Sequence, residues 1–536
     1  MVSKIQLQRL LRCAMGVFFM SSTMVIEAAP IAIQSISQLA MPTNYQTVEV
    51  EGRTYVPLKA IEEASFYIFK ETGDKVEVFV PRVVNQDNTK TEGIELTIPN
   101  YGQGVFIGLP IKRIEGKNYI DQVLVGPAVG VRATNKTAKS LPGFGGVEGQ
   151  ILMLSNLQGQ LTVPAKKQLG QLVWAFDPVG TRENAYGEKQ LIAGDHVISP
   201  SWFQLEKQGK VGVSQANYMY VEEYKKSGFY VWPLITNQFK PALTHEVVSN
   251  QEFWGDYKDY LVAYALLYGY NGYNFDFENI DITDRERLTN FVTYLGKELK
   301  DVGLYTSIDV TGYSTSENWS LVYDRPKLAE AVDYVVHMAY DETWSASKWA
   351  GPVASFPWVK SHTERMLKEV PAEKLVLGVP FYMRDWREKP IHQGDMKKPF
   401  DEVMGKTLAM KDVAPLVEKY KAEMTWDDEL KLHYFTYLDE SGYRHAVWAE
   451  DEASLKEKMG LVKDLKLAGF AAWRKGFESP AHWKAIDKVL NEIAVQEKAQ
   501  QEAERIEREK SKNQKSLKKK NSSLKDEKKT EKSLKK

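Results

Sequence analysis

The middle of the chain alternates between short apolar runs and longer amphipathic segments. Several of the short runs are apolar throughout, which is typical of parallel strands that are buried on both faces. One intervening segment repeats apolar residues with a helical period, at Leu288, Phe291, Val292, Leu295 and Leu299. The strands that we expect are 172–176, 196–202, 229–235, 272–278, 305–310, 332–340, 375–382 and 469–473. Strands and helices that alternate in this way predict a parallel sheet.

Eight strand–helix units of this size are typical of a (β/α)8 TIM barrel, so the sequence predicts the α/β class with this architecture. An open, doubly wound sheet has the same alternation of elements. That fold usually carries a glycine-rich phosphate turn after its first strand, and no such turn follows 172–176. The barrel is therefore the preferred prediction.

The central stretch 271–279, Asn-Gly-Tyr-Asn-Phe-Asp-Phe-Glu-Asn, alternates aromatic and polar side chains with the period of a strand. Asp276 and Glu278 would project from one face, about 6–7 Å apart along the strand. Two carboxylates on an otherwise apolar strand are costly to bury unless they have partners or a task. An edge strand with its polar face in water is the alternative. In a barrel, catalytic groups lie at the carboxyl ends of strands, where this pair falls.

Other expected strand ends carry side chains that suit the same site. Tyr340 and Asp341 close the sixth strand, Tyr382 closes the seventh and Trp473 closes the eighth. Trp344 follows soon after the sixth strand and could stack on a ring of a ligand, although a tryptophan more often packs in a core. We expect these side chains to converge at one end of the barrel.

The segment 30–165 predicts a separate β-rich module with a faint internal repeat. Val50-Glu-Gly-Arg-Thr-Tyr-Val56 is echoed by Ile114-Glu-Gly-Lys-Asn-Tyr-Ile120. The first copy resembles the repeat of copper amine oxidase N-terminal-like domains of bacterial surface proteins. No cluster of His or Cys accompanies it, so the sequence predicts no copper site. The module is either a stalk or wall-binding unit or a spacer without a ligand.

The N-terminal end of the chain predicts a signal peptide over residues 1–29. Basic residues precede an apolar run, which ends at Ala28 and Ala29 with small residues suited to cleavage. An uncleaved N-terminal anchor is the alternative. The only cysteine, Cys13, lies inside this segment, so the mature chain would contain no disulfide. We therefore expect an exported protein, either secreted or associated with the cell envelope.

Charge is distributed unevenly. The formal net charge is −1, but residues 510–536 contain 12 Lys and 3 acidic residues, a net of +9 that leaves about −10 elsewhere. The tail 496–536 begins as a helix-forming sequence and ends as a lysine-rich tract with too few apolar residues to order itself. It either contacts anionic envelope polymers electrostatically or is a solvated tail.

Two other classes of partner are not expected. The chain before the tail offers no basic face for a nucleic acid. The eight His are scattered and form no recognisable ligand set. The sequence therefore predicts no nucleic-acid partner, no metal and no cofactor. The barrel, at 166–495, is expected to work with its own side chains.

These motifs resemble glycoside hydrolase family 18, the chitinase-like family, over about residues 168–490. The family's Asp-Gly-x-Asp-x-Asp-x-Glu strand is matched by Asn271-Gly-Tyr-Asn-Phe-Asp-Phe-Glu278. Its strands six, seven and eight are matched by Met338-Ala-Tyr-Asp341, Gly378-Val-Pro-Phe-Tyr382 and Ala472-Trp-Arg474. The likeness is closest to the spore-cortex and cell-wall N-acetylglucosaminidase branch, on features such as Tyr340-Asp-Glu-Thr-Trp-Ser345.

The resemblance implies retaining catalysis in which the 2-acetamido group of the substrate is the nucleophile. Glu278 would be the general acid, Asp276 would accept the acetamido N–H, and Tyr340 would donate its hydroxyl to the acetamido oxygen. The substrate contacts that it further implies are Trp473, Asn274, Asp341, Tyr382 and Trp344.

The sequence departs from the family motif at its first two aspartates, which are Asn271 and Asn274 here. The Asn274 amide cannot exchange a proton with Asp276 as a carboxylic acid could, although it could still hydrogen-bond to it and hold it in place. Asp276 and Glu278 themselves are intact, so we expect an active enzyme.

The predicted function is hydrolysis of β-1,4 linkages at N-acetylglucosamine, with peptidoglycan as the first choice of substrate and chitin as the second. The expected partner is therefore an N-acetylglucosamine-containing polysaccharide. Two other classes stay open. One is a non-catalytic, lectin-like barrel in which Glu278 is only a ligand contact. The other is an envelope scaffold in which the N-terminal module and the tail matter more than the barrel.

Overall fold

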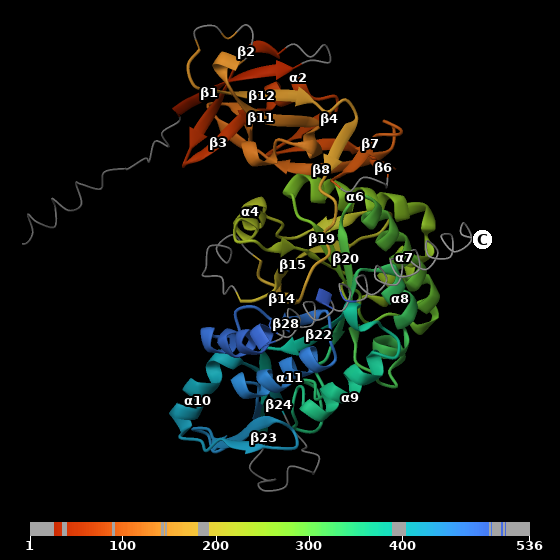
Figure 1. Cartoon of the computed structure of the whole chain (residues 1–536), viewed down its shortest axis with the longest axis vertical. Helices are drawn as coiled ribbons and strands as arrows, with labels where there is room; N and C mark the ends of the chain where they lie inside the picture. Colours follow the sequence, from red (N-terminus) through yellow and green to blue (C-terminus); the bar gives the residue numbers. More distant parts are fainter. Residues whose placement is uncertain are drawn as a thin grey trace, which may run out of the picture.

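The computed structural model describes residues 26–34, 40–87, 92–140, 144, 147–180, 192–388 and 404–492, with a few isolated positions beyond them (Figure 1). The predicted signal peptide, except for its last residues, and almost all of the lysine-rich tail lie outside the described residues. Within the described ranges, no helix has the length and apolar character that crossing a bilayer requires.

The predicted barrel is confirmed. Eight parallel strands follow one another in the order β14-β28-β22-β21-β20-β19-β18-β15, and β15 pairs with β14 to close the ring. Each expected strand has a counterpart. The bounds are β14 (Leu172–Asp177), β15 (Asp195–Leu205), β18 (Leu234–Thr236), β19 (Gly272–Asp276), β20 (Tyr305–Thr311), β21 (Tyr334–Met338), β22 (Leu375–Pro380) and β28 (Gly469–Trp473).

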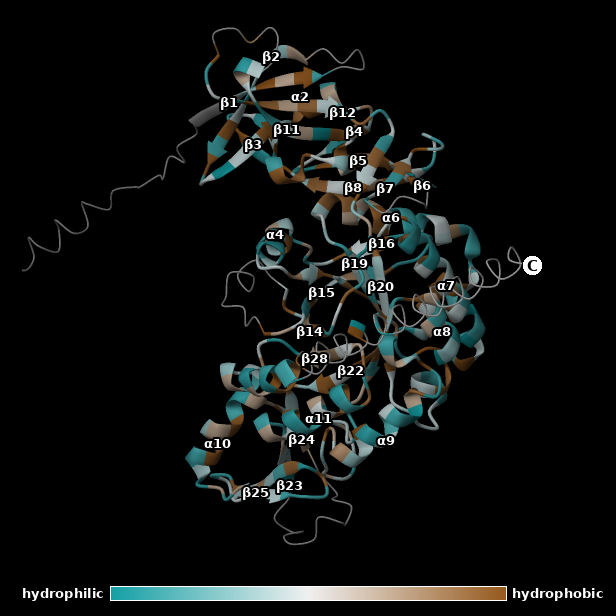
Figure 2. Ribbon diagram, viewed as in Figure 1, coloured by the Kyte–Doolittle hydropathy of each residue, from teal (hydrophilic) through white to brown (hydrophobic). Residues whose placement is uncertain are grey.

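Helices surround the barrel, because each has one apolar face that the strands bury. On α7 (Arg285–Asp301) the predicted stripe from Leu288 to Leu299 is fully buried. Figure 2 shows hydrophilic and hydrophobic residues alternating along the helices. The other barrel helices are α4 (Tyr218–Lys226), α5 (Pro241–Ser249), α6 (Trp254–Tyr268), α8 (Arg325–Ala331), α9 (Phe356–Met366) and α11 (Glu452–Asp464).

A five-stranded antiparallel sheet, in the order β24-β23-β27-β26-β25, is inserted between β22 and β28. Its first strand along the chain, β23, begins two residues after β22 ends, so the insertion starts at the carboxyl end of the barrel. Its elements are β23 (Tyr382–Glu388), β24 (Met404–Ala409), α10 (Val413–Tyr420), β25 (Thr425–Asp427), β26 (Leu432–Leu438) and β27 (Arg444–Ala449).

Residues 26–163 form the N-terminal β region, in which the two sequence repeats are two adjacent hairpins. Both hairpins turn with positive φ, at Glu51 and Gly52 (53° and 74°) and at Glu115 and Gly116 (47° and 77°). Two-residue turns of this kind match the twist of the strands. The seven-stranded sheet of this region has the order β11-β12-β1-β2-β3-β10-β9.

The strands of the N-terminal β region fall into that sheet and two three-stranded sheets, β13-β7-β6 and β4-β5-β8. Their bounds, with one helix, are β1 (Ile26–Gln34), β2 (Ala40–Val50), β3 (Arg53–Pro57), α2 (Leu58–Ala64), β4 (Ile68–Thr72), β5 (Lys75–Pro81), β6 (Val84–Asp87), β7 (Ile94–Thr97), β8 (Gly104–Pro110), β9 (Lys112–Ile114), β10 (Lys117–Asp121), β11 (Val131–Thr137), β12 (Gln150–Asn156) and β13 (Gln160–Val163).

The N-terminal β region packs on the side of the barrel, over helix α6 (Figure 1). Arg82 Nε lies 2.6 Å from Asp259 Oδ2, and the Lys258 ammonium donates to the Val83 carbonyl at 3.3 Å. Asp259 and Lys258 are almost fully buried. A buried charge is tolerated only when it is paired, so these contacts fix the region on the barrel.

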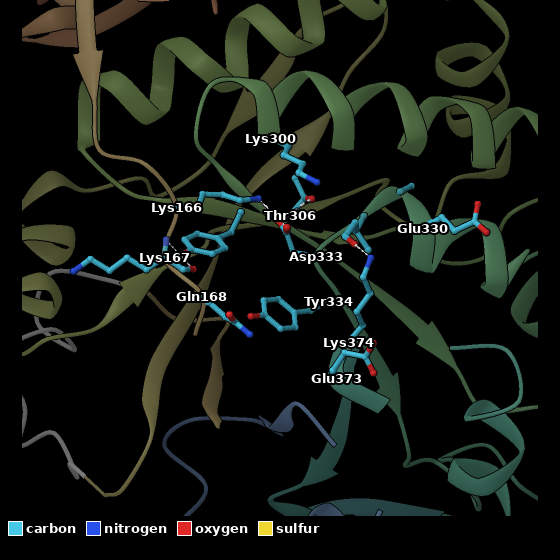
Figure 3. Close-up of a pocket in the computed structure, with 13 residues that line it drawn as sticks. Lys166, Lys167, Gln168, Lys300, Thr306, Glu330, Asp333, Tyr334, Glu373 and Lys374 are labelled. Atoms are coloured by element: carbon cyan, nitrogen blue, oxygen red, sulfur yellow. Dashed lines mark hydrogen bonds and ion pairs between the residues drawn. The ribbon is translucent and has the colours of Figure 1, made fainter. Parts of the chain in front are cut away.

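A pocket of about 270 Å³ lies at the amino ends of strands β20 and β21 (Figure 3). Lys166 Nζ points at Asp333 and donates to its Oδ2 at 2.6 Å. Lys374 Nζ donates to the carbonyls of Ala329 and Val332 at the end of α8, at 2.6 and 2.9 Å. This end of a TIM barrel usually serves stability, and these lysines hold elements together. The pocket lies at the end of the barrel opposite to the predicted catalytic residues.

Candidate active site

The predicted catalytic residues lie at the carboxyl ends of the barrel strands, but several lie beyond them. Asp276 is the last residue of β19, and Glu278 follows it by two positions. Tyr340 and Asp341 lie beyond the end of β21 at Met338, and Tyr382 opens β23. The expected ends of strands four, six and seven were therefore two residues too long, because the aromatic–polar alternation continues past the last ladder pairing.

The chain turns sharply just after two of these residues. Asn279, which follows Glu278, has φ of 53°, and Asp341, which follows Tyr340, has φ of 58°. Asn and Asp adopt this left-handed conformation more readily than other residues with a side chain. The turns direct the chain away from the barrel axis immediately after the residues that the site uses.

Asp276 and Glu278 form a hydrogen-bonded pair of carboxyl groups. Burial raises the pKa of Asp276 to about 7. Burial, followed by the negative charge of Asp276, raises the pKa of Glu278 well above its ordinary value. The hydrogen bond between the two side chains lowers the pKa of Asp276 and raises that of Glu278. The hydrogen bond therefore favours the protonated form of Glu278 and the ionised form of Asp276.

A third carboxyl group, Asp309, lies beside this pair and was not predicted. It belongs to β20, whose register pairs Asn274 with Ser307 and Phe275 with Ile308, so Asp309 lies next to Asp276. Burial, followed by the charge of Asp276, raises the pKa of Asp309 well above its ordinary value. The alternation of Ser307, Asp309 and Thr311 along this strand is the sequence signal that could have revealed it.

The Asn274 amide holds Asp309 rather than Asp276. Its Nδ2 donates to Asp309 Oδ1 at 2.8 Å and to Ser307 Oγ at 3.1 Å. The side chain is fully buried. The sequence suggested that Asn274 could hydrogen-bond directly to Asp276. In the structure Asn274 instead holds Asp309, the neighbour of Asp276. An amide can make these donations at any pH, since it does not titrate.

The backbone of Glu278 is held by Asn237, a second residue that sequence reasoning missed. Asn237 Oδ1 accepts from the Glu278 N–H at 3.1 Å, and its Nδ2 donates to the Glu278 carbonyl at 2.7 Å. Asn237 is fully buried and also donates to Thr244 Oγ1 at 2.8 Å. Because the backbone N–H and carbonyl of Glu278 are both engaged, its backbone is held in place at the mouth of the barrel.

Tyr340, Asp341 and Tyr382 come together as predicted, with Arg384 added. The rings of Tyr340 and Tyr382 lie 6.2 Å apart at 70°. Asp341 Oδ1 accepts from the Tyr382 hydroxyl at 2.7 Å and from Arg384 Nη2 at 2.9 Å. Burial raises the pKa of Tyr340 well above its ordinary value, which keeps its hydroxyl a donor.

The two predicted tryptophans differ in position. Trp473 ends β28, is half-buried, and packs on Phe176 with the ring centroids 5.7 Å apart. Trp344 lies in the loop after β21 and is 58% exposed. Among the described contacts, none joins Trp344 to the carboxyl groups, so only Trp473 belongs to the packed part of the site. Within the described ranges, no three His, Cys, Asp or Glu side chains are arranged to hold a metal ion.

Carboxyl groups gathered at the carboxyl end of a (β/α)8 barrel, with the pKa of Glu278 raised well above its ordinary value, suit a hydrolase that works by general acid catalysis. Comparison with known families gives the same class. The family model described as glycosyl hydrolases family 18 matches residues 177–477, which is more than half of the chain. The chain belongs to this family and is a family 18 glycoside hydrolase, a glycosidase that acts on glycans.

Individual relatives cover the same part of the chain. The uncharacterized glycosylase YvbX of Bacillus subtilis (strain 168) is 29% identical over 304 residues, which are 55% of this chain and 84% of that protein. The cortical fragment-lytic enzyme of Bacillus cereus is 26% identical over 261 residues, 47% of this chain and 58% of that enzyme. The chitinase of Chromobacterium violaceum ATCC 12472 superposes with a TM-score of 0.51 and 25% identity, over 60% of this chain and 99% of that structure.

The position of Asp341 predicts a change in the pH profile. Its negative charge raises the pKa of Glu278, and activity is lost as the pH rises through that pKa. We therefore expect Asp341→Asn to begin losing activity at a lower pH than the wild type. Thr407→Val is the matched control, because Thr407 Oγ1 accepts from Arg384 at 2.6 Å without carrying charge. An unchanged alkaline limb of kcat in Asp341→Asn would contradict the electrostatic coupling.

Proposed function

We propose that the protein is an exported glycosidase that hydrolyses β-1,4 linkages at N-acetylglucosamine in peptidoglycan, by substrate-assisted catalysis with retention. The observation that carries the proposal is the Asp276–Glu278 pair at the carboxyl end of β19, where burial and the charge of Asp276 raise the pKa of Glu278 well above its ordinary value. Export and contact of the lysine-rich tail with anionic envelope polymers belong to the proposal as predictions from the sequence.

In the first step, Glu278 protonates the glycosidic oxygen while the carbonyl oxygen of the substrate acetamido group attacks the anomeric carbon. The bond from this carbon to the leaving oxygen breaks, and an oxazolinium ion forms. The Asp276 carboxylate accepts the acetamido N–H and stabilises the positive charge beside it. The Tyr340 hydroxyl donates to the acetamido oxygen and orients it for attack, while Trp473 forms an apolar floor under the sugar.

In the second step, the Glu278 carboxylate removes a proton from water, which attacks the anomeric carbon and opens the oxazolinium ion. The acetamido carbonyl is restored, Glu278 regains its proton, and the product keeps the configuration of the substrate. The raised pKa of Glu278 suits both halves, since the group must be an acid first and a base afterwards.

The choice of peptidoglycan rests on the cortical fragment-lytic relative, of which this chain spans 58%. Chitin is the other substrate with the required acetamido group. Digestion of purified peptidoglycan and of chitin oligosaccharides, with identification of the new reducing end, distinguishes the two. We expect reducing N-acetylglucosamine from peptidoglycan. Release of only reducing muramic acid would contradict the proposed linkage, and exclusive turnover of chitin oligosaccharides would contradict the proposed substrate.

Two exposed aromatic residues predict where a longer glycan extends from the site. The Phe239 and Trp319 rings lie 6.3 Å apart, and the Asn279 amide donates to the Phe239 carbonyl at 3.0 Å. We expect Trp319→Ala to raise KM for long glycans by about 2- to 10-fold, the loss of one stacking contact. A disaccharide substrate should be unaffected. Trp349→Ala is the control, since Trp349 is 43% exposed and Trp319 40%. Equal KM values for the two variants would contradict this extension.

A further inference from the structure

A second pocket, of about 480 Å³, lies on the N-terminal β region; we call it the module pocket. Val48, Pro57 and Tyr119, from strands β2, β3 and β10, are buried and supply its apolar wall. Its rim carries the amides Asn44, Gln46 and Asn118 and the basic side chains Arg113 and Lys117. A volume of this size can hold a ligand of one or two sugar rings.

The module pocket has a counterpart that is related to it by the sequence repeat. Strands β3 and β10 pair antiparallel with Val56 directly opposite Ile120, and these residues occupy the same place in the two copies. A local two-fold axis therefore passes between them. This axis relates Arg53 to Lys117 and Tyr55 to Tyr119.

The surface of the first copy is occupied by the barrel. Arg53 Nη2 lies 3.6 Å from Glu222 Oε2, and its guanidinium lies 5.2 Å from the centre of the Tyr218 ring. Arg53 Nε also lies 2.5 Å from Asp121 Oδ2, which accepts from the Tyr218 hydroxyl at 2.9 Å. The first copy thus binds a ring and a carboxylate that helix α4 presents.

The second copy has the same scaffold without these partners. Pro57 stands in the place that Asp121 has in the first copy, so Lys117 has no counterpart of the Asp121 carboxylate beside it. Among the described residues, Lys117 forms no ion pair. The Arg113 side chain lies on the other face of the hairpin, where its Nε donates to Asn118 Oδ1 at 3.4 Å. Of the other charged side chains that line the pocket, Lys59 pairs with Glu62 at 2.6 Å, and Glu71 accepts a hydrogen bond from the Asn118 amide at 2.7 Å.

We propose that the module pocket binds a carboxylate-bearing sugar unit of a wall glycan. The sugar ring packs against Tyr119 and Pro57, and the carboxylate meets Lys117, as the Tyr218 ring and the Glu222 carboxylate meet Arg53 in the first copy. The Asn44 and Gln46 amides of the rim can serve hydroxyl and acetamido groups. The choice of a wall glycan rests on the proposed function, whereas the ring-and-carboxylate chemistry rests on the repeat.

The test is cosedimentation of the full-length protein with purified peptidoglycan sacculi, either native or with their carboxyl groups amidated. We expect Lys117→Glu to bind native sacculi about tenfold more weakly, since a charge-assisted contact becomes a repulsion. Arg132→Glu is the matched control, because it changes charge equally on the exposed face of β11, at the opposite edge of the sheet. Amidation of the sacculi should remove the difference between wild type and Lys117→Glu.

Turnover of soluble chitin oligosaccharides by the same proteins separates this inference from the proposed function. Both variants should keep wild-type turnover, because neither substitution lies in the barrel. If Lys117→Glu and Arg132→Glu weaken binding to sacculi equally, the module pocket is not the binding site, and general charge attraction explains the binding. Binding of Lys117→Glu to sacculi could instead stay weaker than wild type after amidation and match it once phosphate polymers are removed from the sacculi. That result would overturn the carboxylate as the group that the module pocket binds. Absence of turnover in the wild type, with the binding pattern intact, would overturn only the proposed function.

Discussion

The variant Glu278→Gln is expected to lose turnover of chitin and peptidoglycan fragments by roughly 100- to 10,000-fold, the range that general acid catalysis supplies. The amide has nearly the shape of the acid but has no acidic proton to give to the leaving oxygen. Asn237 holds Glu278 through its backbone, so the substituted side chain should keep its direction. The measurement is kcat on oligosaccharides, with the thermal unfolding temperature as a check that the barrel is intact.

The leaving group provides the control for this prediction. The nitrophenolate group of a nitrophenyl glycoside leaves without full protonation. The loss of turnover caused by Glu278→Gln should therefore be smaller on this substrate than on a natural oligosaccharide. Wild-type turnover by the variant would refute the acid role of Glu278. A wild-type protein that binds oligosaccharides without hydrolysing them would favour the lectin-like alternative for this chain.

The barrel could be predicted from the sequence because its strands are buried on both faces. Strands such as β14 and β22, with every residue buried, leave a continuous apolar signature that surface strands lack. Helix α7 could be predicted for a related reason, since only its inner stripe is apolar. The strand ends were less certain, because the pattern Asp276–Phe277–Glu278 alternates equally well inside and outside the ladder.

The site was predictable where polar residues interrupt an apolar strand, and not where they act from the next strand or through the backbone. Asp276 and Glu278 interrupt such a strand. Asp309 does the same on β20, but its importance depends on the lateral register with β19, which no single strand reveals. Asn237 acts on the peptide of Glu278, and a hydrogen bond between residues so far apart in sequence leaves no local pattern.

The relation between the N-terminal β region and the barrel also required the structure. The repeat was visible in the sequence, but the pairing of Val56 with Ile120 was not, and that pairing makes the two copies equivalent. The contact between Arg53 and Glu222 joins positions that are remote in the sequence. The difference between Pro57 and Asp121 at equivalent positions of the two copies could be interpreted only once the structure showed that helix α4 contacts the first copy.

The variant Asp276→Asn is expected to lower kcat by roughly 100- to 1,000-fold, with a smaller effect on KM, because Asp276 acts on charge that develops in the transition state. An amide at this position no longer offers a negative charge to the forming oxazolinium ion. Its NH2 group can also point a donor at the acetamido N–H, where an acceptor is needed. Glu278 is still present, so any loss reports on Asp276 itself.

The pH profile of Asp276→Asn distinguishes this role from a structural one. The charge of Asp276 raises the pKa of Glu278, and activity falls as the pH rises through that pKa. Removing the charge lowers the pKa of Glu278, so the alkaline loss of kcat should begin at lower pH than in the wild type. Ser307→Ala is the control, since it removes a hydrogen bond to Asn274 in the same layer without changing charge. A reduced kcat with an unshifted alkaline limb would mean that Asp276 supports the fold rather than the protonated state of Glu278. A kcat within about threefold of the wild type would remove Asp276 from the mechanism altogether.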